Sequence, residues 1–282
     1  QPMQDRALPG LFVCDRRPAR VEAKGWGAST MSLRAEPAPK RIALLTDFGR
    51  GPYVGQIELC LSAICGAVPV IELISDLVPF RPDLAAYLLP GLCRTMPLGT
   101  VYLCVVDPGV GSDRAVLAAR IGDDWLLAPD NGLLLPMLRR ARDARVFRID
   151  WRPDRLSASF HGRDLFAPLA ARLCGGELPG AAATAPDALV GADWPPSRLV
   201  ICYVDDFGNL ITGCDADDIA PDRILAAGAR RLSFARTFSD VAPGDAFWYR
   251  NAFGLVEIAV NQGRADVALG LTAGKTVTIA GA

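Results

Sequence analysis

Apolar and polar positions alternate regularly along residues 41–174, and this pattern predicts the secondary structure. Short apolar runs typical of buried strands occupy residues 42–45, 68–74, 101–106 and 145–149. Apolar residues at helical spacing lie between or after them, in residues 56–65, 84–94, 133–142 and 165–173. Residues 116–120 and 125–128 are typical of a hairpin. Alternating strands and helices predict an α/β N-terminal domain with a mostly parallel sheet.

The pattern changes on either side of this region. Residues 1–40 show no periodicity and predict a disordered or non-native extension. Residues 175–196 are rich in Ala, Pro and Gly and predict a connector at a domain boundary. After it, short strands separated by turns predict a small all-β, barrel-like or sandwich domain. The predicted divisions are 1–40 as the extension, 41–190 as the α/β catalytic domain and 197–282 as the β-barrel-like domain.

The stretch from Thr100 to Arg114 carries the first candidate for chemistry. Its apolar run shows no alternation, which suits a strand buried on both faces. The run ends at Asp107, and the chain then turns through Pro108-Gly109-Val110-Gly111. Ligands of open α/β sheets bind at the carboxyl ends of the strands. We therefore expect Asp107 and Arg114 to converge on one pocket, although a plain turn with a surface ion pair gives the same pattern.

Composition excludes several classes of protein. The 30 basic and 31 acidic residues nearly cancel, and without a basic stripe nucleic acid is not an expected partner. No apolar stretch has the length of an uninterrupted membrane span. The 8 cysteines form no C-x-x-C pair and there is a single histidine, so neither a metal site nor a disulfide framework is predicted. Buried free thiols suit a cytoplasmic protein.

Acidic or amide residues stand beside glycine in several loops that follow apolar strands. These loops are 46–49, 107–111, 129–132 and 205–209. Singly each is most often a turn, but together they favour a polar small-molecule site. His161, beside Arg163 and Asp164, is either a structural hydrogen-bonded histidine or a group that handles a proton.

The sequence resembles a known family, the S-adenosyl-L-methionine (SAM) hydroxide adenosyltransferases. Members of this family are relatives of the fluorinating and chlorinating adenosyl enzymes. The motifs that carry the resemblance are LTDFG with PYVG (45–55), GTVYLCVVDPGVGSDR (99–114), APDNG (128–132), SFHGRDLFAP (159–168), DDFGN (205–209) and EIAVNQG (257–263). They follow one order from about residue 41 to residue 270. Residues 1–40 lie outside the resemblance.

The resemblance implies a SAM hydrolase that forms adenosine and L-methionine. It implies an α/β N-terminal domain, a barrel-like C-terminal domain and a homotrimer with active sites at subunit interfaces. The catalytic residues would be Asp107, Arg114 and His161, and either Asp107 or His161 would receive the proton of the attacking water. SAM is the substrate, and no cofactor is implied. The implied substrate-binding residues are Asp47 at the ribose hydroxyls, Phe80 over the ribose, Asp206 or Asp205 at the methionine ammonium, Phe207 and Asn209 at the adenine, and Asn251 in the motif 251–254.

Two alternatives to a hydrolase remain at this stage. A SAM-dependent halogenase would need a neutral halide site, and the carboxylate of Asp107 would repel chloride. A non-catalytic adenosine or SAM-binding module would keep Asp47, Phe207 and Asn209 but would not need the three catalytic residues together. One departure from the family pattern is Ala252, which stands where serine is usual and removes a hydroxyl near the methionine carboxylate.

Overall fold

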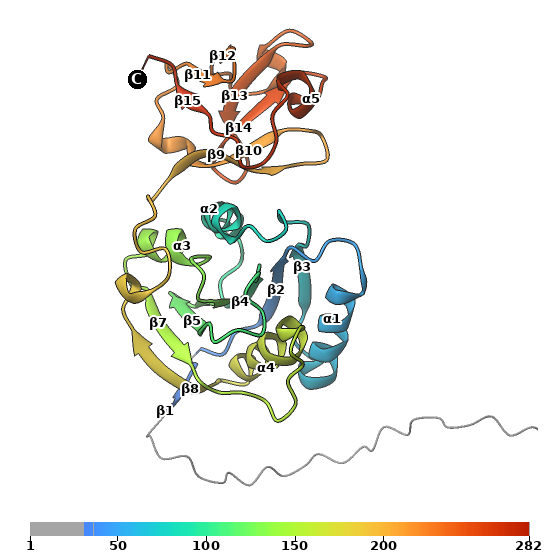
Figure 1. Ribbon diagram of the computed structural model, residues 1–282, viewed down its shortest axis with the longest axis vertical. Coiled ribbons are helices and arrows are strands. Elements are labelled where there is room, and N and C mark those ends of the chain that lie inside the picture. The colour runs from blue at the N-terminus through green and yellow to red at the C-terminus, as the bar shows by residue number, and fades with distance from the viewer. Residues whose placement is uncertain (1–30, 36, 282) are drawn as a thin grey trace, which may run out of the picture.

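The computed structural model describes residues 31–35 and 37–281, and its larger part is built on a mixed sheet (Figure 1). The 8-stranded sheet has the order β1-β8-β7-β5-β6-β4-β2-β3. Its strands are β1 (Met31–Arg34), β2 (Arg41–Thr46), β3 (Val70–Ile74), β4 (Thr100–Val105), β5 (Val116–Ile121), β6 (Asp124–Pro129), β7 (Arg145–Ile149) and β8 (Glu177–Thr184).

The pairing of the strands differs between the two halves of this sheet. Strands β3, β2, β4 and β6 are parallel neighbours, whereas β5, β7, β8 and β1 are joined by antiparallel pairing. The change occurs at the predicted hairpin, where Ile121 pairs with Asp124 and Gly122 takes a positive φ of 57° in the turn. Such a tight turn can only join antiparallel strands. The prediction of a mostly parallel sheet is thus confirmed for one half and wrong for the other.

Helices cover both faces of the sheet. Helices α1 (Pro52–Cys65) and α4 (Ala167–Cys174) share one apolar core, and α2 (Pro82–Cys93) and α3 (Leu135–Arg140) share the other. Alternate residues of β4 belong to opposite cores, Tyr102 to the second and Leu103 to the first. Because side chains alternate across a strand, this confirms a β4 buried on both faces. Helix α2 begins at Pro82, two residues before the predicted start at residue 84, and Asp83 in its first turn pairs with Arg81.

The smaller part of the chain is all β apart from short helical turns and α5 (Ala265–Leu269). One sheet has the order β13-β14-β10-β9 and the other the order β12-β11-β15. Isolated bridges link Val200 and Trp248 of the first sheet to Thr276 and Phe234, which lie two residues from strands of the second sheet. The bounds are β9 (Arg198–Val204), β10 (Leu210–Asp215), β11 (Leu225–Ala227), β12 (Arg230–Leu232), β13 (Ala246–Arg250), β14 (Leu255–Val260) and β15 (Thr278–Ile279).

Two segments without a predicted strand contain one. Within residues 1–40, Met31–Arg34 form β1, and within the predicted connector Glu177–Thr184 form β8. Strand β8 pairs with both β1 and β7. Backbone pairing needs no particular side chain, so an Ala-rich segment beside an established sheet can join it. The prediction for residues 1–30 lies outside the described residues. Over the described part of the chain, none of the helices has the length and apolarity to cross a membrane.

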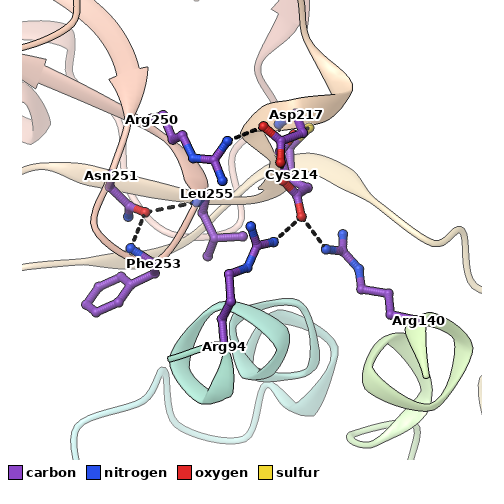
Figure 2. A network of polar contacts seen from close by, with 9 residues as sticks. Arg94, Arg140, Cys214, Asp217, Arg250, Asn251, Phe253 and Leu255 are labelled. Carbon is purple, nitrogen blue, oxygen red and sulfur yellow. Dashed lines mark hydrogen bonds and ion pairs between the residues drawn. The ribbon is translucent and has the colours of Figure 1, made fainter. Parts of the chain in front are cut away.

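The β region packs directly on α2. Apolar residues of β9, β10 and β14 belong to the same core as α2. Asp215 at the end of β10 accepts hydrogen bonds from Arg94, next to α2, and from Arg140 of α3 at 2.6 Å. Figure 2 shows both arginines pointing from their helices toward the β region, beside the turn of Asn251 and Phe253. The next residue after Asp215, Ala216, donates its backbone N–H to the carbonyl of Gly254 in that turn at 2.9 Å, so the turn is held to the segment that the arginines bind.

Candidate active site

The carboxyl end of β4 delivers Asp107 into a tight loop. Ser112 donates its backbone N–H to the carbonyl of Gly109 at 3.1 Å, which closes one turn of this loop. Gly111 has a φ of 82°, and a Cβ there would lie 2.7 Å from the carbonyl oxygen of Ala158. Only glycine tolerates both conditions without strain. The loop therefore lies against the segment that precedes His161.

Asp107, Arg114 and His161 form one contiguous cluster. The Nε of Arg114 donates to both carboxylate oxygens of Asp107, at 2.8 and 2.7 Å, and its Nη2 also contacts that carboxylate. The same Nη2 lies 3.0 Å from Nδ1 of His161. The side chains of Arg114 and Asp107 are 9% and 5% exposed. A forked, buried pair of this kind is geometrically specific, which excludes the simpler reading of a surface ion pair.

The contact with Arg114 settles the protonation of His161. A guanidinium has no hydrogen-bond acceptor, so Nδ1 must accept and the hydrogen of the neutral ring must sit on Nε2. Burial lowers the pKa of His161 below its ordinary value, and the positive charge of Arg114 lowers it further. His161 is thus a neutral imidazole that offers an N–H, positioned by an arginine.

The pH dependence of stability gives a direct test of this state. Because the pKa of His161 is lower in the folded than in the unfolded chain, the unfolded chain binds more protons as the pH falls from about 6.5. The free energy of unfolding should therefore decrease from about pH 6.5 down to the folded pKa and show no further histidine effect below it. A titration of the imidazole signals by NMR measures the folded pKa without overlap, since the chain has 1 histidine. A folded pKa above 6.5 would contradict this assignment.

A cavity of about 320 Å³ opens beside the cluster. Asp47, Phe80, Asp107 and His161 all line it. The carboxylate of Asp47 accepts a hydrogen bond from the backbone N–H of Phe80 at 2.9 Å. Burial raises the pKa of Asp47, and this hydrogen bond offsets only part of the increase. Phe80 has a φ of 62°, an unusual value for a non-glycine residue, and its side chain is exposed. The structure thus brings these predicted residues of the α/β part together.

Aromatic residues in the wall of this cavity received no role from the sequence. The ring centroids of Phe48, Tyr53 and Phe160 lie 5.2 to 5.9 Å apart in tilted and edge-on pairs. All three line the cavity, and each stands within two residues of a glycine in the quoted motifs. This proximity to glycine was the signal available in the sequence. A π-helical turn, Gly162–Phe166, follows His161 directly. Such turns are frequent at functional sites.

The remaining predicted residues lie in the β region. A second cavity, of about 550 Å³, is lined by Phe207, Asn209 and Asn251. Asp205 accepts the backbone N–H and the side-chain amide of Asn209, at 2.8 and 3.0 Å, so both of its oxygens are engaged. Asp206 has no such side-chain bond within residues 31–35 and 37–281, and it lines a third cavity of about 530 Å³ between the α/β part and the β region. Of the two aspartates, Asp206 is the one free to bind a ligand.

The loop at residues 129–132 is structural. Asp130 pairs with Arg148 at 3.0 Å and accepts the backbone N–H of Val190 at 3.0 Å. Asn131 donates to the carbonyl of Val106 at 2.8 Å and so supports the end of β4. Neither residue lines the three cavities described here. This loop therefore contributes to the site only by holding the strand that carries Asp107.

A buried Asp–Arg–His cluster beside a cavity of carboxylates and aromatic rings, in an α/β protein with an appended β region, defines a small-molecule enzyme. Comparison with known families makes this specific. The N-terminal domain of the SAM hydroxide adenosyltransferases matches residues 42–182, and their C-terminal domain matches residues 199–278. The chain belongs to this family.

Individual proteins agree with this assignment. The (R)-S-adenosyl-L-methionine hydrolase of Salinispora arenicola is 35% identical over 258 residues, covering 84% of this chain and 97% of the relative. A fluorinase of Actinopolyspora mzabensis is more distant, at 24% identity over 84% of this chain and 96% of its own. The crystal structure of an uncharacterized conserved protein from Thermotoga maritima is similar with a TM-score of 0.75 and 29% identity, covering 84% and 99% of the two chains.

Proposed function

We propose that this protein hydrolyses S-adenosyl-L-methionine to adenosine and L-methionine. The observation that carries the proposal is the buried contact of Asp107, Arg114 and His161 beside a cavity. Asp47 faces the same cavity, and a carboxylate there can accept hydrogen bonds from ribose hydroxyls. The relatives whose names specify the (R) epimer at sulfur lead us to expect that this enzyme also uses that epimer.

The reaction is a displacement at the ribose C5′. The oxygen of water forms a bond to C5′, the C5′–S bond breaks, and its electron pair converts the sulfonium into the neutral thioether of methionine. The proton that water loses must pass to a base. Attack by a developing hydroxide on a cation cancels charge, so a desolvated pocket strengthens the attraction. Holding the water in line with the C–S bond lowers the barrier further.

The geometry supports different roles for the members of the cluster. His161 carries hydrogen on Nε2 and faces Arg114 through Nδ1, so the neutral ring can orient the water as a donor but has no free nitrogen for its proton. Asp107 lines the cavity and keeps lone pairs beyond those that Arg114 occupies. This supports Asp107 as the proton acceptor and Arg114 as the fixed charge that positions both partners.

Incubation of the purified protein with each sulfonium epimer of SAM, with and without excess chloride, tests the proposed function. Chromatography should find adenosine and methionine in equal amounts, from the (R) epimer and independent of chloride. Chlorinated adenosine would instead identify a halogenase, and bound but unchanged SAM would identify a binding module. We expect hydrolysis, because the carboxylate of Asp107 in the cavity wall repels a halide.

We further propose a homotrimer in which neighbouring subunits complete each site. The cavity of Asp107 and the cavity of Asn209 share no lining residue within one chain. A substrate that needs both Asp47 and Asn209 must therefore bridge two surfaces, and a cyclic assembly brings one surface of each chain against the other surface of the next. SAM is the substrate, and we propose that no cofactor takes part.

Mixing two inactive variants tests the shared site. Asp107→Ala and Asn209→Ala should each be nearly inactive alone. When they are co-expressed, some interfaces combine two intact halves, and about a quarter of wild-type activity is expected from random assembly. Light scattering would give the mass of the assembly in the same preparation. Activity that stays at the level of the single variants would place the complete site within one chain.

A further inference from the structure

Phe166 is a fully buried aromatic residue that has no role in the proposed reaction as described so far. It is the last residue of the π-helical turn Gly162–Phe166 and is 0% exposed. Its ring belongs to the apolar core that α1 and α4 share. The guanidinium carbon of Arg114 lies over this ring, 5.8 Å from the ring centroid. Arg114 therefore rests on a side chain that the core holds in place.

Phe166 gives Arg114 a contact of a different kind from its hydrogen bonds. The N–H groups of the guanidinium face Asp107 and His161, and these contacts fix the three polar side chains relative to one another. The ring of Phe166 adds a contact from the core. A cation over an aromatic ring is attracted by the quadrupole of the ring, and the attraction is stronger where water is excluded. The side chain of Arg114 is 9% exposed, so the contact lies in such a place.

The π turn explains how His161 and Phe166 both reach the same arginine. The two residues are five apart, and because each residue of an α-helix turns the chain by about 100°, their side chains would point about 140° apart there. In a π turn the hydrogen bond spans five residues instead of four, as does the bond from the N–H of Ala167 to the carbonyl of Gly162. Residues five apart then lie on one side of the turn. The wider turn thus presents the imidazole and the ring together to Arg114.

We propose that Phe166 is a positioning residue that holds Arg114, and through it Asp107 and His161, in the geometry of the reaction. The inference rests on the proposed hydrolysis, in which Arg114 positions both partners. A displacement of about 1 Å in such a cluster can lower a rate by about a hundredfold. Phe166 is not among the residues that line the cavity of Asp107. Loss of the ring should therefore slow the chemical step and leave the binding of substrate almost unchanged.

A purely structural role is the competing explanation, because Phe166 also fills the core. The turn is held by packing at its other end as well. A Cβ at Gly162 would lie 3.1 Å from the ring of Phe48 and 3.3 Å from the side chain of Ile57. If packing alone places Arg114, loss of the ring of Phe166 would lower the stability of the protein. The molecules that remain folded would then have normal kinetics and a normal His161.

Substitution of Phe166 by leucine separates the two roles. Phe166→Leu keeps an apolar side chain in the core but offers the guanidinium no aromatic face. Phe166→Met is a second variant without a ring, and its flexible side chain adapts to the space that remains. The matched control is Phe147→Leu. Phe147 packs against the same core, and its ring contacts Trp125 rather than Arg114. Urea unfolding gives the cost in stability of each variant.

The first readout is the kinetics of the folded full-length protein. For Phe166→Leu and Phe166→Met we expect kcat for SAM hydrolysis to fall about tenfold, with KM within about twofold of wild type. Phe147→Leu should keep both constants within about twofold of wild type. A loss of activity that only follows the loss of folded protein would instead be shared by all three variants in proportion to their stability.

The second readout is the pKa of His161, measured by NMR in the absence of substrate. The charged groups that act on this pKa are Arg114 and Arg152, which lower it, and Asp107 and Asp164, which raise it. In Phe166→Leu the displaced Arg114 should lower it less, so the pKa should rise toward about 6.5. Phe147→Leu should leave it at the wild-type value.

Three results would overturn the proposal. They are an unchanged kcat in Phe166→Leu, an unchanged pKa of His161 in that variant, and equal effects of Phe166→Leu and Phe147→Leu on either quantity. If the wild-type protein released no adenosine from SAM, the proposed function would fail. The pKa of His161 needs no turnover, so it would still decide whether Phe166 positions Arg114.

Discussion

Asp107→Asn should lower kcat for SAM hydrolysis by about a thousandfold. The amide keeps the shape of the side chain, but it cannot take the proton from water, and a positioned base contributes about 10²- to 10⁴-fold. The amide also places an N–H group against the guanidinium of Arg114, whose N–H donates to the carboxylate in the wild-type protein. Two donors then face each other. Initial rates of adenosine release, measured at saturating SAM, give the effect on kcat directly.

The matched control for this experiment is Asp113→Asn. Asp113 lies in the same loop but is exposed, so its loss removes one carboxylate near the site without touching the cluster. Its kcat should stay within about twofold of wild type, as expected for a surface substitution. If Asp107→Asn retained more than about a tenth of the activity, Asp107 would not be the base.

Arg114→Met should destabilise the protein by about 3 to 5 kcal/mol and abolish activity. Its loss leaves Asp107, whose side chain is 5% exposed, as a buried carboxylate without a counter-charge, and breaking a buried pair from one side has a cost of this size. It also removes the partner of Nδ1 of His161. Urea unfolding followed by circular dichroism measures the change in free energy.

A double variant shows whether the cost comes from the unpaired charge. Asp107→Asn combined with Arg114→Met removes both charges, so it should be more stable than Arg114→Met alone. Arg172→Met, which removes a partner of Glu177 in a pair 45% and 62% exposed, should cost less than about 1 kcal/mol. A double variant no more stable than Arg114→Met would show that lost packing, not charge, is responsible.

The sequence predicts the strands well where burial determines them and poorly where pairing alone does. Strand β4 has an unbroken apolar run because both faces are covered, and this signal is local. Strand β8 is rich in alanine and only partly buried, and it exists because β7 and β1 lie on either side of it. The signal for β8 therefore lies in its tertiary neighbours and not in its local sequence. The antiparallel pairing of β7 likewise depends on its neighbour, because β7 lies beside β5, which the hairpin turns against β6.

The site shows a similar division. Asp107 and Arg114 are close in sequence and flank one loop, so their convergence was predictable from the residues, whereas the role of His161 came from the resemblance to a family. The acceptor role of its Nδ1 depends on the position of Arg114, which no pattern encodes. The hydrogen bonds that Asn209 donates to Asp205 could not be predicted from the sequence for the same reason. They leave Asp206 as the aspartate that can bind a ligand.

The apolar core that the β region shares with α2 determines how the protein unfolds. Helix α2 contributes to one apolar cluster with Val200, Cys202 and Leu255, and Asp215 is held by arginines of the α/β part. Cutting the chain near residue 197 would expose this surface on both fragments. The two family segments are therefore expected to melt in one cooperative calorimetric transition, and neither should be obtained as a stable fragment by expression on its own.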